Sequence, residues 1–193
     1  MVVNLSKRDA KEPFLRDVAQ FRRMLKFALF FYPKLERLAD PIDALETVER
    51  QTLREMDFTC EISGAERLST LATERADELP HLRKLKFPEY FRGFSSDRLL
   101  VSGFVEGRTL NDWLDAGELP YEALLDLFRI HGYFLFIRGE FHGDLHPGNV
   151  IWHDGQFWFL DNANIESVPP EFGRGIFRML VLLGEGDLAR AAD

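Results

Sequence analysis

The segment 142–161 constrains the fold of this chain more than any other stretch. Residues 142–149 read HGDLHPGN. A short apolar run over 150–152 comes next, and the pair Asp154-Gly155 separates it from a second apolar run over 157–160. An Asp-Gly pair between two apolar runs is a strong signal for a β-hairpin with a tight turn. We therefore expect a compact loop that leads directly into an antiparallel hairpin.

The two ends of this expected hairpin carry side chains with oxygen atoms. Asn149 precedes the first strand and Asp161 follows the second, so antiparallel pairing brings both to the same edge. Magnesium prefers hard oxygen ligands of this kind beside the phosphates of a nucleotide. We expect Asn149 and Asp161 to hold Mg²⁺, and Asn149 to contribute to nucleotide binding.

The loop itself supplies a catalytic candidate. Asp144 lies five residues before Asn149, which is the spacing of the acceptor-orienting aspartate and the metal-binding asparagine in a phosphoryl-transfer loop. We interpret Asp144 as the base or the residue that positions the acceptor. His142 is expected to brace the loop, and His146 either binds the phosphates of the cofactor or simply packs. The alternative interpretation is a tight connection without chemistry.

Composition narrows the class of protein. The 193 residues are 46 % hydrophobic and include 18 phenylalanines, which is enough for a sizeable core. The formal charge of −8 argues against a nucleic-acid partner, because phosphate backbones attract an excess of lysine and arginine. The single cysteine, Cys60, excludes an internal disulfide and fits a reducing compartment such as the cytoplasm. No segment approaches the roughly 20 consecutive apolar residues of a membrane span.

Periodic apolar residues predict two long helical segments in the first half of the chain. One covers residues 13–38, and Pro33 is expected to break or kink it. Asp40-Pro41 marks the start of the next helix, which is expected to run over 42–76. The arginine-flanked apolar stretch 21–31 is expected to pack in the core, and a membrane surface is the alternative.

The second half alternates between strands and helices. Short apolar runs over 80–105 favour strands, and a centrally buried helix is predicted over 120–138. A further helix is predicted over 172–192, interrupted near residues 184 and 186. We therefore expect an α+β fold in two parts. Residues 1–105 form a partial N-terminal lobe with long helices and short strands, and residues 106–193 form a helix-rich C-terminal lobe with the catalytic loop and the metal-binding hairpin.

The loop HGDLHPGN, the hairpin and Leu160-Asp161 resemble two groups that share the protein-kinase-like fold. One group is the UbiB/AarF-type atypical kinases linked to ubiquinone (isoprenoid-quinone) biosynthesis, and the other is the aminoglycoside/choline phosphotransferases. Residues 52–65, TLREMDFTCEISGA, decide between them. They resemble the UbiB/AarF pattern of Glu-x-Asp, a glutamate four residues later, and then a small residue.

This resemblance implies roles for three acidic residues. Glu61 corresponds to the helix glutamate that pairs with the nucleotide lysine, and Glu55 and Asp57 correspond to an additional acidic pair that faces the active site. On a continuous helix, Asp57 and Glu61 would share one face. The alternative is an ordinary solvated acidic surface. The resemblance also implies ATP and Mg²⁺ as cofactors and a small-molecule or lipid acceptor.

The sequence departs from the family pattern at two places. Residues 161–163 read Asp-Asn-Ala where the family has Asp-Phe-Gly, so the metal carboxylate is kept and the phenylalanine and glycine are lost. Counting back from Asp17 places Asn4 where the nucleotide lysine is expected, and Lys7 is expected to point elsewhere. We therefore expect a member truncated in its N-terminal lobe, with slow phosphoryl transfer.

Three functions follow from the sequence. The first is an ATP- and Mg²⁺-binding atypical kinase or ATPase of the UbiB/AarF type. The second is a small-molecule phosphotransferase of the aminoglycoside/choline type, which does not account for the acidic pattern over 55–61. The third is a catalytically weak pseudokinase scaffold. A metallophosphoesterase is disfavoured, because no second spaced aspartate–histidine cluster accompanies residues 143–146.

Overall fold

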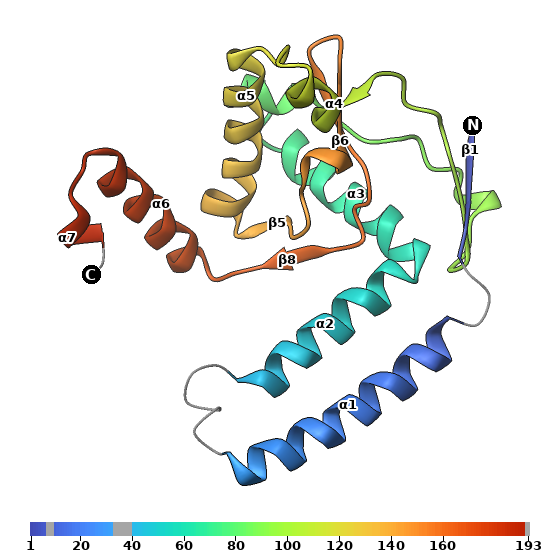
Figure 1. Ribbon diagram of the computed structural model, residues 1–193. Helices are drawn as coiled ribbons and strands as arrows, with labels where there is room; N and C mark the ends of the chain where they lie inside the picture. The colour runs from blue at the N-terminus through green and yellow to red at the C-terminus, as the bar shows by residue number, and fades with distance from the viewer. Residues whose placement is uncertain (7–9, 33–39, 192–193) are drawn as a thin grey trace.

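The computed structural model describes residues 1–6, 10–32 and 40–191, and it has the expected mixture of helices and strands. Figure 1 shows a central body, from which a two-helix arm projects on one side and the C-terminal helices on another. The first strand, β1 (Val2–Leu5), pairs antiparallel with β3 (Leu99–Ser102). Lys7 and Pro33 lie outside the described residues.

The arm consists of two antiparallel helices, α1 (Lys11–Phe31) and α2 (Pro41–Glu55). Arg22 on α1 links them through ion pairs to Glu46 at 3.7 Å and Glu49 at 2.5 Å. The carboxylate of Asp40 accepts hydrogen bonds from the backbone N–H groups at positions 42 and 43. This N-cap confirms the helix start that the Asp-Pro pair predicts.

The expectation that residues 21–31 pack in the core is wrong. Only Val18 and Leu29 of α1 are buried, while Phe27 is 67 % and Phe30 is 78 % exposed. The physical reason is that α1 packs along α2 and leaves the other side of the helix uncovered (Figure 1). Within the described ranges, no helix is both long and apolar enough to cross a bilayer.

The predicted single helix over 42–76 is also wrong, because the chain breaks after α2. Asp57 adopts an extended backbone (φ −122°, ψ 100°), and its carboxylate accepts a hydrogen bond from the backbone N–H of Thr59 at 2.9 Å. Asp57 is thus the N-cap of a new helix, α3 (Phe58–Thr73), which enters the body (Figure 1). Asp57 and Glu61 therefore do not stand on one face of a continuous helix.

Short strands in the body confirm the strand prediction for 80–105 and the predicted hairpin. A four-stranded sheet has the order β2-β7-β6-β4, in which β2 is parallel to β7 and the other pairs are antiparallel. A separate pair, β5 and β8, is antiparallel. The strand bounds are Leu85–Lys86 (β2), Arg108–Thr109 (β4), Glu140–His142 (β5), Val150–His153 (β6), Gln156–Phe159 (β7) and Ile165–Ser167 (β8).

The remaining helices lie in the second half of the chain. The predicted apolar helix over 120–138 is continuous, but its last six residues form a π-helical turn. The predicted interruption of the last helix near Gly184 and Gly186 is confirmed. The bounds are Leu110–Asp115 (α4), Tyr121–Gly132 (α5), Tyr133–Arg138 (π-helical turn), Pro170–Gly184 (α6) and Leu188–Ala191 (α7).

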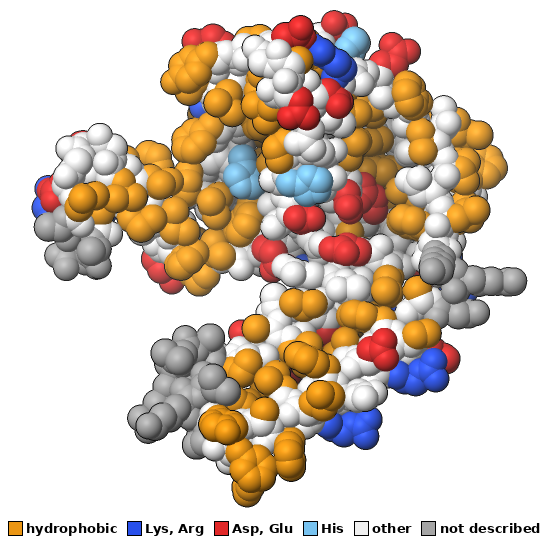
Figure 2. Space-filling model, in the orientation of Figure 1, with side chains coloured by type: hydrophobic (Ala, Val, Ile, Leu, Met, Phe, Trp, Pro, Cys, Tyr) orange, Lys and Arg blue, Asp and Glu red, His pale blue; other side chains and the backbone are white. Residues whose placement is uncertain are grey.

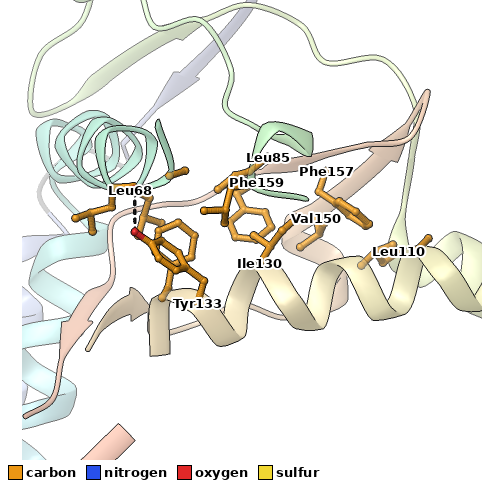
Figure 3. Close-up of a cluster of buried hydrophobic side chains, with 13 residues drawn as sticks. Leu68, Leu85, Leu110, Ile130, Tyr133, Val150, Phe157 and Phe159 are labelled. Carbon is orange, nitrogen blue, oxygen red and sulfur yellow. Dashed lines mark hydrogen bonds between the residues drawn. The ribbon is translucent and has the colours of Figure 1, made fainter. Parts of the chain in front are cut away.

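One buried apolar cluster joins α3, α5 and the four-stranded sheet (Figure 3). Leu68, Ile130 and Phe159 are fully buried in it, and the hydroxyl of Tyr133 donates a hydrogen bond to the carbonyl of Leu71 at 2.9 Å. The cluster thus contains residues from both sides of position 105. The division of the chain at that position stays a prediction.

Candidate functional site

The hairpin brings Asn149 and Asp161 to one edge, as the sequence predicts. Its turn residues Asp154 and Gly155 both have positive φ (49° and 73°), which suits the tight turn of a two-residue hairpin. At the open end, the backbone N–H of Leu160 donates to the carbonyl of Asn149 at 2.8 Å. This bond ties the residue before Asp161 to Asn149.

The loop before the hairpin arranges its polar side chains around a short 3₁₀ turn. Nδ1 of His146 accepts a hydrogen bond from the N–H of Gly148 at 3.1 Å, so this ring caps the turn. The amide of Asn149 donates to the carbonyl of Asp144 at 3.4 Å. Its side-chain oxygen, and the exposed carboxylate of Asp144, make no hydrogen bond to the part of the chain that the structure describes.

His142 braces this loop from inside the protein. Its Nδ1 accepts a hydrogen bond from the N–H of Asp144 at 3.2 Å, and its Nε2 lies 3.3 Å from the carbonyl oxygen of Leu160. A backbone N–H can only donate, so Nδ1 is unprotonated and Nε2 carries the hydrogen. Burial lowers the pKa of His142, which favours this neutral form. One ring thus connects the segments that carry Asp144 and Asp161.

Glu61 is buried beside Asp161, at the end of α3 that faces the hairpin. Its Oε1 accepts a hydrogen bond from the hydroxyl of Tyr90 at 2.6 Å and lies 3.4 Å from the side-chain nitrogen of Asn162. Burial raises the pKa of the Glu61 carboxyl, and the hydrogen bond from Tyr90 opposes that rise. No lysine or arginine of the described residues forms an ion pair with Glu61.

Glu55 and Asp57 have different hydrogen-bonding partners. Oε1 of Glu55 accepts a hydrogen bond from the side chain of Asn164 at 2.7 Å, and the carbonyl of Asn164 accepts one from the N–H of Gly143 at 2.7 Å. Glu55 is therefore connected to the catalytic loop. Asp57, which caps α3, lines a separate cavity together with Ser6 and Arg98. The role of Glu55 and Asp57 as an acidic pair that faces the active site stays a prediction.

A cavity of about 220 Å³ opens beside Asp161. It extends from β1 to the hairpin, and Asn4, Glu61 and Asp161 lie on its walls. Asn4 thus stands on the same cavity as Glu61, where the sequence places it. The other lining residues are Val2, Pro88, Tyr90, Leu100, Ser102, Gly103, Phe104, Val105, Ile151 and Leu160.

A larger cavity of about 680 Å³ lies elsewhere, between α5, the π-helical turn and α6. Its walls include Phe128, Phe136 and Phe177 and contain no carboxylate or side-chain amide. Magnesium prefers oxygen ligands, so the cavity beside Asp161 is the better candidate. Asp161 lines this cavity, and Asn149 lies opposite Leu160 in the adjoining hairpin. A carboxylate and an amide oxygen fit Mg²⁺, which retains several waters and needs only one or two protein ligands.

Tyr90, Asn162 and Asn164 were not predicted as site residues. Both asparagines follow Asp161 closely in the sequence, so their amides could have been noticed as hydrogen-bonding partners of the acidic residues. Tyr90 lies 29 positions from Glu61 and 72 from Asn162. No local pattern marks it.

Comparisons with known proteins identify the family of this chain. The family model described as "ABC1 atypical kinase-like domain" matches residues 1–193. An ABC1 family protein of Schizosaccharomyces pombe is 26 % identical over 160 residues, which are 81 % of this chain and 28 % of that protein. A probable protein kinase UbiB of Vibrio vulnificus is 26 % identical over 156 residues, which are 78 % of this chain and 27 % of that protein.

A solved structure shows the same fold. The chain in the Rv3197–erythromycin complex from Mycobacterium tuberculosis has a TM-score of 0.62 and 21 % identity to this chain. The match covers 98 % of this chain and 46 % of that one. This chain spans less than a third of the length of the two curated relatives above.

Proposed function

The chain belongs to the ABC1 atypical kinase-like family and has its kinase-like fold, and we propose that it binds ATP with Mg²⁺ in the cavity beside Asp161. The observation that carries the proposal is the register of the hairpin, which places Asn149 opposite Leu160, the residue before Asp161. The loop before Asn149 also presents Asp144. When bound, Mg²⁺ would neutralise phosphate charge during phosphoryl transfer.

Each polar group of the loop has a proposed task. The side-chain oxygens of Asn149 and Asp161 hold the ion, and the carboxylate of Asp144 orients the attacking hydroxyl or water. His142 keeps the two segments in register through its two ring nitrogens. His146 caps the turn, and its exposed ring remains available to a phosphate group. We leave Asp57 out of the site because it caps α3.

The acceptor and the pathway are also proposals. The resemblance to UbiB-type kinases supports a small-molecule or lipid acceptor and a link to ubiquinone biosynthesis. Family membership supports this function over an aminoglycoside/choline-type phosphotransferase. This chain spans less than a third of the length of these relatives. That the chain is active by itself is therefore also a proposal.

The test compares three variants in nucleotide binding and ATP turnover at a series of Mg²⁺ concentrations. We expect Asp161→Asn to lose the Mg²⁺ dependence of binding. Asp144→Asn is expected to keep binding and to lose about 10²–10⁴-fold in turnover, the usual contribution of a positioned acid or base. His153→Gln, at the exposed end of β6 beside the turn, is the control. Unchanged binding and turnover in both aspartate variants would remove the proposed roles.

A pseudokinase scaffold is the second candidate, and one observation favours it. The carboxyl of Glu61 accepts hydrogen bonds from Tyr90 and Asn162, and no lysine of the described residues forms an ion pair with it. A scaffold of this kind is expected to bind nucleotide, with a rise in the melting temperature, and to release no phosphate. Wild-type turnover that Asp144→Asn abolishes would exclude it.

A further inference from the structure

A buried polar cluster fixes the residue that follows Asp161. Asn162 is fully buried, and its side-chain nitrogen donates to the carbonyl of Phe159 at 3.0 Å. The same nitrogen lies 3.4 Å from Oε1 of Glu61 and 3.4 Å from the hydroxyl of Tyr90. Three segments that are far apart in sequence, α3, the segment before β3 and the turn after β7, therefore meet at one amide.

Backbone hydrogen bonds fix the position of Tyr90 beside the end of β3. Its neighbours on both sides are hydrogen-bonded to the end of β3, with the N–H of Phe91 donating to the carbonyl of Val101 at 2.9 Å and the N–H of Gly103 donating to the carbonyl of Glu89 at 2.8 Å. The hydroxyl of Tyr90 then donates to the buried carboxyl of Glu61 at 2.6 Å. A buried carboxyl needs such donors, because a buried polar group without a partner is costly.

Asp161 is anchored on both sides and is itself in an unusual conformation. Leu160 is fixed by its N–H bond to Asn149 and by the contact of its carbonyl with His142. Asn162 is fixed by the buried cluster. Between them, Asp161 has φ of 53°, a left-handed conformation that a residue other than glycine adopts at a cost. Such a conformation persists where the surroundings hold it, and it occurs often at functional sites.

We propose that Tyr90 and Asn162 are positioning residues for the magnesium carboxylate, a proposal that rests on the function above. They hold the backbone of residue 162, and so keep the exposed carboxylate of Asp161 aimed at the mouth of the hairpin beside Asn149. In this chain the buried glutamate of α3 is connected to the metal side chain through Tyr90 and Asn162. Asn162 is fully buried, and Tyr90 lies on the wall of the cavity, where its hydroxyl holds the carboxyl of Glu61.

The competing interpretation is that the cluster only stabilises the fold. Both interpretations predict that removing the Tyr90 hydroxyl lowers the free energy of unfolding, because a buried hydrogen bond is lost. Only positioning predicts that the Mg²⁺ requirement of nucleotide binding also changes. Loss of a hydrogen-bonding partner behind a metal ligand typically costs 10–100-fold in metal affinity.

The chain offers a matched control at Tyr133. Its hydroxyl also makes one buried hydrogen bond, to the carbonyl of Leu71 at 2.9 Å, and lies in the apolar cluster of Figure 3. Tyr90→Phe and Tyr133→Phe thus remove the same chemical group from a partly buried and a buried position. Only the first place is connected to Asp161.

The experiment measures binding of ADP by the full chain, by calorimetry, as Mg²⁺ is varied. We expect Tyr90→Phe to raise the Mg²⁺ concentration for half-maximal binding at least tenfold, and Tyr133→Phe to stay within about twofold of wild type. Asn162→Ala is expected to shift it in the same direction as Tyr90→Phe, and it serves as the test if Tyr90→Phe does not fold. A shift in these variants no larger than that of Tyr133→Phe would overturn the proposal.

Asp161→Asn, measured in parallel, separates this proposal from the function on which it rests. If Asp161→Asn weakens Mg²⁺-dependent binding and Tyr90→Phe does not, only the positioning role is overturned. If wild-type binding does not depend on Mg²⁺, or if Asp161→Asn behaves as wild type, the proposed function is overturned and the positioning role is overturned with it.

Discussion

Gly64 allows α3 to approach the turn that carries Asp161. A Cβ added at Gly64 would overlap the carbonyl oxygen of Asn162 and lie 3.0 Å from a side-chain carbon of Ile165. The obstacle is backbone, and this backbone is fixed by the buried side chain of Asn162. The small residue in the family pattern thus has a packing reason in this chain.

The first prediction reverses the usual effect of alanine in a helix. Alanine normally stabilises a helix interior by about 1 kcal/mol relative to glycine. We expect Gly64→Ala instead to lower the free energy of unfolding by about 1–3 kcal/mol, because the added methyl has no space. Gly175→Ala is the control, since Gly175 on α6 has open space around its Cβ position. Urea unfolding should give opposite signs for the two variants, and a stabilised Gly64→Ala would contradict the close approach.

The second prediction concerns pH and His131. Burial, and then the neighbouring His142, lower the pKa of His131 in the folded state. The unfolded chain, with an ordinary histidine pKa of about 6.5, therefore binds the proton first as the pH falls. Stability from this residue is complete above about pH 6.5 and is lost as the pH falls towards the folded-state pKa.

Replacing His131 should flatten that dependence. His131 packs edge-on against Phe141, so His131→Phe keeps an aromatic ring and removes the titration. We expect the fall in unfolding free energy between pH 7 and pH 5 to become smaller, by no more than about 1.4 kcal/mol per pH unit. Urea unfolding across this range measures it, with His153→Gln at the exposed end of β6 as the control. An unchanged pH profile in His131→Phe would contradict the assignment.

At the scale of elements, the break between α2 and α3 is the main difference from the sequence expectation. The apolar spacing continues across residues 52–65, and this continuity is what predicts one helix. Asp57 competes with that pattern, because its carboxylate satisfies a backbone N–H at a helix start. A periodicity argument does not detect an N-cap of this kind inside a continuous apolar pattern.

The hairpin was predictable because its signal is local. Asp154-Gly155 determines the turn, the turn determines the register, and the register places Asn149 opposite Leu160. The cluster around Tyr90 was not predictable, because its contacts join residues that are far apart in the chain and no periodic pattern specifies them. The hairpin that carries Asn149 and Asp161 was therefore accessible from sequence, and the buried cluster behind it was not.

The third prediction tests Asp57 as a cap. Asparagine is as good an N-cap as aspartate, and alanine is poor. We expect Asp57→Ala to lower the free energy of unfolding by about 1 kcal/mol, and Asp57→Asn to stay within a few tenths of a kcal/mol of wild type. Mg²⁺-dependent ADP binding should be unchanged in Asp57→Asn. Weaker binding in that variant would instead support the acidic role that the family resemblance implies.

At the scale of the whole molecule, the apolar surface of the arm is far from the proposed nucleotide cavity. Phe27 lies one helical turn before the adjacent Phe30 and Phe31 on α1. The ring of Phe31 packs edge to face with the other two rings, and each of the three side chains is more than half exposed. Figure 2 shows this apolar group at the outer end of the arm, away from the body. Exposed apolar groups of this kind often mark an interaction surface.

The last prediction is that this end of the arm binds anionic membranes peripherally. Lys26 and Arg23 are exposed beside the aromatic group, and aromatic side chains with nearby basic residues favour the interface of an anionic bilayer. We expect co-sedimentation with vesicles of anionic phospholipid and weaker binding to neutral ones. Phe30→Ser should lower the partition coefficient about 10- to 100-fold, since burial of a phenylalanine contributes about 1.5–3 kcal/mol. Phe94→Ser is the matched control, because Phe94 is 73 % exposed and lies outside the arm. Equal losses in the two variants, or no sedimentation with either vesicle, would contradict membrane binding and favour a protein partner for the arm.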